Sequence, residues 1–255
     1  MPSRQCKNRI RRYDEYYTRY EHVKNIFERY IPCEELKDKI IYLPCDSDKS
    51  NFVIYLKEHK EDIGYKELIY TWDDYNTHID LFEYCDIIIT NPPFSKIIKE
   101  FIPILNKVNK KFFILGGAVT VTSYYDHFDD KNIKYVSPVE WFDFIMPDDA
   151  PEGYSSWPRY LYISNMNIKS YRPRTKDRKR EFKDIYAELP DRKIKNYDRL
   201  SEIPDDEYDE ILVPCTVLYE HWREIFDIID IHKFRDVIRY TDGKNKYIRI
   251  LVKRK

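Results

Sequence analysis

The sequence predicts an α/β protein with a mostly parallel sheet, covered by helices on both faces, of the Rossmann-like type. Apolar segments of strand composition alternate with segments of helical spacing along residues 1–165. The run Ile87-Ile88-Ile89 lacks polar alternation, which is typical of a strand buried on both faces in a parallel sheet. Since 42% of the 255 residues are hydrophobic and 16% are aromatic, the chain can bury a core in spite of its 35% charged content.

The first element expected is a helix that begins at Asp14 or Glu15 and ends before Pro32, because apolar residues recur there at helical spacing. Strand, loop and helix units then follow one another along the chain. The strands are expected at residues 39–43, 67–71, 86–90, 112–115, 133–136 and 159–164, with helices at residues 50–59 and from the turn after residue 90 through Leu105.

The character of the chain changes after Asn165. Residues 169–195 hold eleven Lys or Arg against five Asp or Glu and show no convincing apolar period, so we expect a linker or an extended arm. A small closing region follows, with apolar segments at residues 211–215, 226–231 and 247–252. We therefore expect two domains, residues 1–165 and residues 166–255.

Overall charge and cysteine content exclude several classes of protein. The formal net charge is -1, so any contact with phosphates must come from a local patch. Five widely spaced cysteines without a Cys-x-x-Cys pair favour reduced thiols and argue against a zinc site or a disulfide scaffold, so no metal is expected. No stretch approaches the roughly 18 apolar residues of a membrane span, and we expect a cytoplasmic protein.

Asn91-Pro92-Pro93-Phe94, directly after the apolar strand, predicts a methyl-transfer site for a planar amino group. Such an amino group shares its lone pair with a ring or carbonyl and is a poor nucleophile. The Asn91 side-chain oxygen and the Pro92 carbonyl can accept its two hydrogens and so localise the lone pair. The prolines fix φ and remove competing donors, and Phe94 offers a face for stacking. The alternative is an ordinary strand-ending turn.

Two acidic loops follow the first two expected strands, where an adenosine cofactor of a parallel sheet would lie. Asp46 and Asp48 could receive an ammonium group, and Asp73 or Asp74 could accept a hydrogen bond from ribose. The alternatives are capping of the helix before Asn51 and a solvated turn, respectively. The glycine-rich turn that often accompanies such cofactors is absent after the first strand.

Several segments together resemble the EcoRI-type family of adenine-specific DNA methyltransferases. Asp14-Glu15-Tyr16-Tyr17-Thr18 is similar to the Asp-Glu-Phe-Tyr-Thr that opens those enzymes, and Cys45-Asp46 through Ser50-Asn51-Phe52 to their first-strand loop. Residues 86–95 resemble their Asp-Ile-Val-Val-Thr-Asn-Pro-Pro-Phe-Ser, and Tyr197-Asp198 with Val213-Pro214 resembles a later part. The resemblance spans roughly residues 12 to 255, although residues 74–86 leave little room for a full strand and helix.

The resemblance implies a class I S-adenosylmethionine-dependent methyltransferase that acts on a flipped-out adenine in double-stranded DNA, with a catalytic first domain and a DNA-recognition second domain. The implied catalytic residues are Asn91, Pro92, Pro93 and Phe94. The implied cofactor-binding residues are Asp14, Tyr16, Tyr17, Thr18, Cys45, Asp46, Ser47, Asn51, Asp73, Asp74 and Asn91.

A basic run in the second domain is the candidate for contact with DNA phosphates, namely Arg172, Arg174, Arg178, Lys179 and Arg180. Its alternative is a solvated face. Residues 154–157 form an aromatic loop that either lines a base pocket or packs in the core. Two other functions stay open at this point: an RNA adenine or protein glutamine methyltransferase, and a catalytically silent domain that binds nucleic acid. The recognition sequence, the restriction, orphan or viral role and the oligomeric state are open too.

Overall fold

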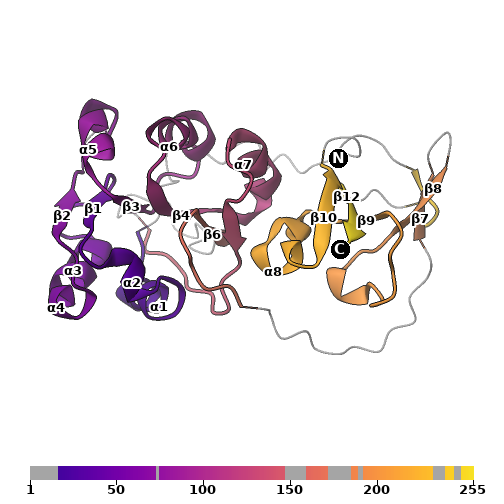
Figure 1. Cartoon of the computed structure of the whole chain (residues 1–255), viewed down its shortest axis with the longest axis horizontal. Coiled ribbons are helices and arrows are strands. Elements are labelled where there is room, and N and C mark those ends of the chain that lie inside the picture. The colour runs from indigo at the N-terminus through magenta and orange to yellow at the C-terminus, as the bar shows by residue number, and fades with distance from the viewer. Residues whose placement is uncertain are drawn as a thin grey trace. The chain divides into compact units, whose positions relative to one another are not determined.

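The computed structural model describes residues 17–72, 75–146, 159–171, 185–188, 192–231, 239–243 and 248–255. The chain divides into two compact units, residues 1–170 and residues 171–255, which are shown in Figure 1. Within the described ranges, every helix is too short or too polar to cross a membrane.

The first unit is built on a six-stranded sheet with the order β2-β1-β3-β4-β6-β5. Its strands are β1 (Ile40–Leu43), β2 (Glu67–Tyr70), β3 (Ile87–Thr90), β4 (Lys111–Gly117), β5 (Lys134–Val136) and β6 (Tyr160–Ser164). Strands β2, β1, β3 and β4 are parallel, as the sequence predicted. Strand β6 lies between β4 and β5 and runs antiparallel to both, so the sheet is partly antiparallel.

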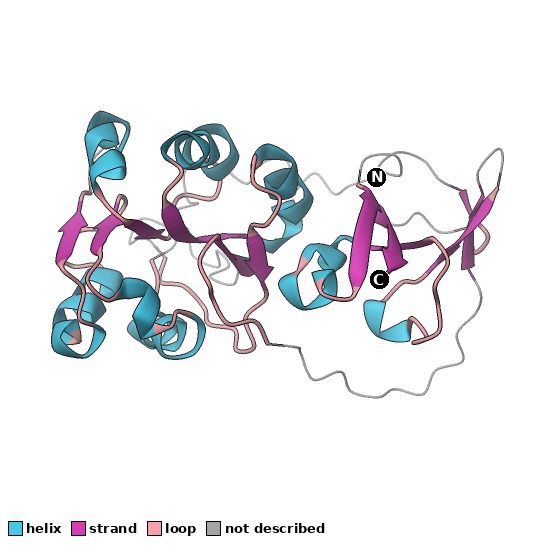
Figure 2. Cartoon of the chain, viewed as in Figure 1, coloured by secondary structure: helices cyan, strands magenta, loops and turns pink. Residues whose placement is uncertain are grey.

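Helices cover both faces of this sheet, with α1 to α4 on one face and α5 to α7 on the other (Figures 1 and 2). The helical segments are α1 (Tyr20–Asn25), η3 (Ile26–Tyr30), α2 (Cys33–Leu36), α3 (Asn51–Glu58), α4 (Lys60–Ile63), η4 (Tyr75–His78), α5 (Ile79–Tyr84), η5 (Ile97–Phe101), α6 (Ile102–Val108), η6 (Ala118–Thr120) and α7 (Val121–His127). All residues of β1, β3 and β6 are buried, which confirms the reading of Ile87-Ile88-Ile89 as a strand covered on both faces.

The first helix begins at Tyr20, later than the sequence predicted. Tyr17 instead forms a β-bridge with Ile145, in which the two backbones exchange N–H···O hydrogen bonds of 3.0 and 2.8 Å. Arg19 is extended, with φ -67° and ψ 153°. The expected helix is therefore wrong for residues 17–19, because a long-range strand contact overrides their local helical pattern. Asp14 and Glu15 lie outside the described residues.

The second unit holds another six-stranded sheet, with the order β10-β12-β9-β8-β7-β11. Its elements are β7 (Ile185–Glu188), β8 (Lys193–Asn196), η7 (Leu200–Glu202), β9 (Ile211–Pro214), η8 (Cys215–Leu218), α8 (Glu220–Arg223), β10 (Phe226–Asp230), β11 (Arg239–Tyr240) and β12 (Arg249–Arg254). Its strand pairs are antiparallel except for β8 and β9, which are parallel.

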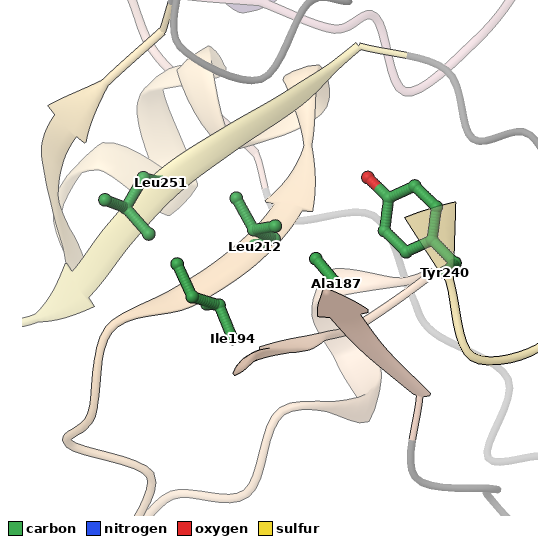
Figure 3. Close-up of a cluster of buried hydrophobic side chains, with 5 residues drawn as sticks. All are labelled: Ala187, Ile194, Leu212, Tyr240 and Leu251. Carbon is green, nitrogen blue, oxygen red and sulfur yellow. The ribbon is translucent and has the colours of Figure 1, made fainter. Parts of the chain in front are cut away.

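The expected extended arm of residues 169–195 is wrong in its last part, because β7 and β8 form an antiparallel pair there. The inward side chains of this pair join a buried cluster with strands β9, β11 and β12 (Figure 3). The cluster consists of Ala187, Ile194, Leu212, Tyr240 and Leu251. The apolar period of two was hidden in the sequence because Lys193 and Lys195 flank Ile194 and dominate the local composition.

Arg249, on β12, is a buried cation that ties the second unit together. Its Nε donates to Asn196 Oδ1 and its Nη2 donates to Asp198 Oδ1, both at 2.9 Å. Asn196 is buried as well, and its amide donates to the same Asp198 oxygen at 3.1 Å. The guanidinium is thus neutralised across the sheet, which is the condition for keeping a charge inside a protein.

His22, on α1, is fully buried in the first unit among aromatic rings. Its Nε2 lies 3.1 Å from the Tyr162 hydroxyl, and the ring of Phe142 stacks on it with centroids 5.1 Å apart. Nδ1 has no hydrogen-bond partner among the described residues. Burial lowers the pKa of His22 to about 3, so the imidazole is neutral in the folded protein.

Acid should therefore destabilise the protein through His22. In the unfolded chain this side chain takes up a proton below about pH 6.5, whereas the folded protein resists protonation down to about pH 3. The contribution of His22 to stability is therefore fully present above pH 6.5 and is lost as the pH falls. At pH 5 the unfolding free energy should be about 2 kcal/mol lower than at neutral pH because of this group alone. Urea unfolding of wild type and His22→Phe at pH 5, 6 and 7 measures it. An equal pH dependence in both proteins would refute this account of His22.

Candidate functional site

The site lies where the chain changes direction across the first sheet. After β1 the chain moves outward to β2, and it then returns to the other side of β1 as β3. The loops after β1 and β3 therefore leave the same edge of the sheet and diverge. In open α/β sheets this edge, at the reversal of strand order, is where ligands bind.

Asn91 follows β3 directly and is fixed by the segment that precedes the first helix. Its Nδ2 donates to Thr18 Oγ1 at 3.2 Å. Asn51, the first residue of α3, donates through its Nδ2 to the Thr18 carbonyl at 2.8 Å. Thr18 is buried between them. Three residues that were predicted to share a site are thus joined by hydrogen bonds, although 73 positions separate Thr18 from Asn91.

The two prolines form the turn that leads from β3 into the next helix. Pro92 is buried, and the Pro93 carbonyl accepts the N–H of Lys96 at 2.9 Å, which closes the turn. Phe94 lies against the end of β4, where a Cβ on Gly117 would be only 3.7 Å from its Cδ2. The half-buried ring of Phe94 therefore stands at the same edge of the sheet as Asn91.

Asp46, in the loop after β1, is a buried carboxylate that is only partly satisfied. Its N–H donates to the Thr71 carbonyl at 3.1 Å, and the Ser50 hydroxyl donates to its Oδ1. Thr90 is near, yet neither its hydroxyl nor Asp46 Oδ2 makes a well-formed hydrogen bond within the described residues. Burial raises the pKa of Asp46 to about 6, an effect that the hydroxyls of Ser50 and Thr90 reduce.

The N-cap of α3 is Ser50, whose Oγ accepts the N–H of Phe52 at 3.3 Å. Helix capping by Asp46 or Asp48 was an alternative reading of this loop. Asp48 is exposed, and Asp46 acts on the helix start only through the Ser50 hydroxyl. Ser47 shapes the loop, since its carbonyl accepts the N–H of Ser50 at 3.0 Å, and the neighbouring Cys45 is half-buried.

An aromatic pair borders this loop. The rings of Tyr17 and Trp72 stack with centroids 6.1 Å apart and an interplanar angle of 19°. Both remain accessible, with 37% of Tyr17 and 55% of Trp72 exposed. Tyr17 precedes Thr18, and Trp72 follows Thr71, the partner of Asp46. The pair thus presents aromatic surface beside the buried carboxylate.

Sequence reasoning missed Ser50, Thr71, Trp72 and Thr90 as members of this site. Trp72 had a signal, because it follows the second strand next to the acidic pair. Ser50 and Thr90 lie in segments that carry the family resemblance, whereas nothing in the sequence marks Thr71. Other predicted residues lie outside the described part of the chain: Asp14, Tyr16, Asp73, Asp74, residues 154–157, Arg172, Arg174, Arg178, Lys179 and Arg180.

The sequence matches the model of a known family, described as adenine-specific methyltransferase EcoRI, over residues 73–246. The chain belongs to this family of adenine-specific methyltransferases. The Type II methyltransferase M.EcoRI of Escherichia coli is 27% identical over an alignment of 311 positions, which covers 95% of this chain and 93% of that protein. The Type II methyltransferase M.MpnI of Mycoplasma pneumoniae is 23% identical over 218 positions, covering 69% and 66% respectively.

In a methyltransferase, loss of the hydrogen bond between Thr18 and Asn91 should slow catalysis. Thr18→Val removes the hydroxyl that accepts from Asn91 while keeping the side-chain shape, so the amide loses its orientation. We expect kcat to fall about tenfold, because a hydrogen bond to a positioned group contributes about 1 kcal/mol or somewhat more. Thr18→Ser keeps the hydroxyl and is the matched control. Equal kcat values for both variants in a methylation assay would show that this bond does not position Asn91.

Proposed function

We propose that this chain transfers a methyl group from S-adenosylmethionine to the exocyclic amino group of an adenine flipped out of a DNA duplex. The observation that carries the proposal is Asn91, held by Thr18 at the end of a buried parallel strand, in a chain of the adenine-specific methyltransferase family. The two Type II methyltransferase relatives support the choice of DNA over RNA or a protein glutamine.

The fold that we propose in detail is the Rossmann-like class I arrangement. Four parallel strands, the reversal of strand order between β1 and β3, and helices on both faces support it. The antiparallel β6 is the departure from a fully parallel sheet. Between β2 and β3 the described residues hold η4 and α5 but no further strand, so β2 is the outermost described strand of the sheet on that side.

In the loop after β1, Asp46 is suited to bind the methionine part of S-adenosylmethionine. The buried Oδ2 that lacks a hydrogen bond would find a partner in the ammonium group of the methionine part. Tyr17 and Trp72 would supply aromatic contact for the adenine part. Bound there, the cofactor supplies an electrophilic methyl group on a sulfonium.

The turn after β3 would bind and orient the substrate amino group. Because Asn91 Nδ2 donates to Thr18, its Oδ1 is the side-chain atom assigned to accept one amino hydrogen. The Pro93 carbonyl already accepts the N–H of Lys96 in the turn. We therefore assign the Pro92 carbonyl as the acceptor of the second amino hydrogen. These two acceptors would localise the nitrogen lone pair, so that the N–C bond could form as the bond between the methyl carbon and the sulfonium sulfur breaks. Phe94 stacks on the flipped base, and the displaced proton leaves to solvent or along the carbonyls.

Duplex binding is assigned to the second unit and to the basic residues Arg172, Arg174, Arg178, Lys179 and Arg180, which lie outside the described residues. Lys and Arg side chains bind phosphates without reading sequence. Such binding weakens steeply as the salt concentration rises, because the release of counterions from the DNA becomes less favourable. Competition among duplex DNA, RNA and protein substrates tests the substrate class. Preferential methylation of RNA or of a glutamine would replace this part of the proposal.

Asn91→Ala should abolish methyl transfer and leave cofactor affinity nearly unchanged. The substitution removes an acceptor for the reacting amino group, whereas Asp46 and the aromatic pair stay in place. Calorimetry with S-adenosylmethionine measures binding, and sequencing that detects N6-methyladenine in DNA measures transfer. Undiminished methylation by Asn91→Ala would overturn the proposed function.

Cofactor affinity should depend on pH through Asp46, whose pKa burial raises to about 6. A bound ammonium group favours the ionised form of Asp46. The affinity for S-adenosylmethionine should therefore be highest and constant well above pH 6, and it should fall as the pH decreases below 6. The decrease approaches about tenfold per pH unit once the carboxyl is protonated in the free protein. Asp46→Asn should bind weakly at pH 8 and lack this dependence. If calorimetry gives wild type and Asp46→Asn the same dependence of cofactor affinity on pH, a group other than Asp46 causes it.

A further inference from the structure

Val119, in the short helix η6 that follows β4, is the most exposed large apolar side chain among the described residues. Its exposed fraction is 82%, and the next highest is 58%, at Tyr208. Single apolar residues on a surface are common and need no explanation by themselves. The position and rigidity of Val119 distinguish it.

Val119 stands beyond the proposed catalytic turn. In the pairing of β3 with β4, Thr90 is opposite Ile114, and β4 continues for three more residues to Gly117. At about 3.3 Å per residue, β4 reaches about 10 Å past the end of β3. Gly117 lies beside the Phe94 ring, and Val119 comes two residues later. The exposed side chain is therefore displayed at the edge from which a flipped adenine would approach Asn91.

The chain is held by two hydrogen bonds directly before Val119, at the start of η6. The N–H of Ala118 donates to the Arg159 carbonyl at 2.9 Å, and the N–H of Gly117 donates to the Tyr124 hydroxyl at 3.1 Å. Valine is stiff at χ1, so little side-chain entropy is lost when it is inserted between bases. Arg159 is exposed at the same edge, which places a positive charge near an approaching phosphate.

We propose that Val119 is a positioning residue that enters the base stack and fills the space left by the extruded adenine. Extrusion costs stacking and pairing energy, and apolar side chains that insert between bases stabilise the opened duplex. The role rests on the proposed function, because it requires that the chain act on a base within a duplex. Val119 then favours the extruded state without contacting the reacting atoms.

The methylated site is first identified by sequencing DNA from cells that express the full chain. The test then compares two duplexes that contain this site. In one duplex the target adenine is paired with thymine, and in the other it faces an abasic position and is already unpaired. Single-turnover methylation by Val119→Ala should be about tenfold slower on the paired duplex and within about twofold of wild type on the unpaired one. Val119→Ile keeps the apolar bulk and should retain the wild-type rate on both.

Val108→Ala is the matched control, because it is the same substitution at a half-buried valine. Val108 is the last residue of α6, and β4 begins three residues later at Lys111. Val108 therefore lies near the edge at which β4 begins, away from its Gly117 end, and its substitution should leave both rates unchanged.

Two results would overturn the role of Val119. One is a Val119→Ala rate equal to wild type on the paired duplex, and the other is an equal loss on both duplexes. A second readout places 2-aminopurine at the target position, where its fluorescence rises on extrusion; Val119→Ala should show a smaller rise than wild type. Wild-type protein that methylates neither duplex would instead refute the proposed function, and the role of Val119 would fall with it.

Discussion

Thr18 accepts two hydrogen bonds, one through its hydroxyl from Asn91 and one through its carbonyl from Asn51, and the site depends on them. They join three distant parts of the chain: the segment before the first helix, the start of α3 and the end of β3. Each bond alone contributes about 1 kcal/mol to stability. Their larger effect is geometric, because an amide that orients a reacting amino group must itself be held.

Among the buried titratable side chains of the first unit, His22 and Asp46 have pKa values that are shifted in opposite directions from their ordinary values. His22 is kept neutral among aromatic rings, and its pKa falls to about 3. Asp46 is buried with one oxygen unsatisfied, and its pKa rises to about 6. A buried acceptor without a hydrogen bond costs stability, and such costs are concentrated at sites that a ligand completes. Under the proposed function, Asp46 is half of an ion pair whose other half would arrive with the cofactor.

Much of the first sheet could be predicted, because β1 and β3 are apolar runs and their burial follows from composition. The direction of β6 could not, since strand composition does not distinguish a parallel neighbour from an antiparallel one. The pair β7 and β8 was hidden by lysines around Ile194, although its inward positions are apolar. In the site, Asn91 and Asp46 were visible as local motifs. Thr71 and Thr90 approach Asp46 only because β1 pairs with β2 and β3, which local composition does not reveal.

Amide hydrogen exchange of the full chain, with and without S-adenosylmethionine, measures most directly whether these loops form one cofactor site. If they do, the cofactor slows exchange in the peptides that cover residues 17–19, 44–51 and 90–94 together, because the hydrogen bonds of Thr18 couple them. The same three regions should respond less in Thr18→Val. Cofactor binding that leaves all three unprotected, or protects only residues 171–255, would contradict a site at the carboxyl ends of β1 and β3.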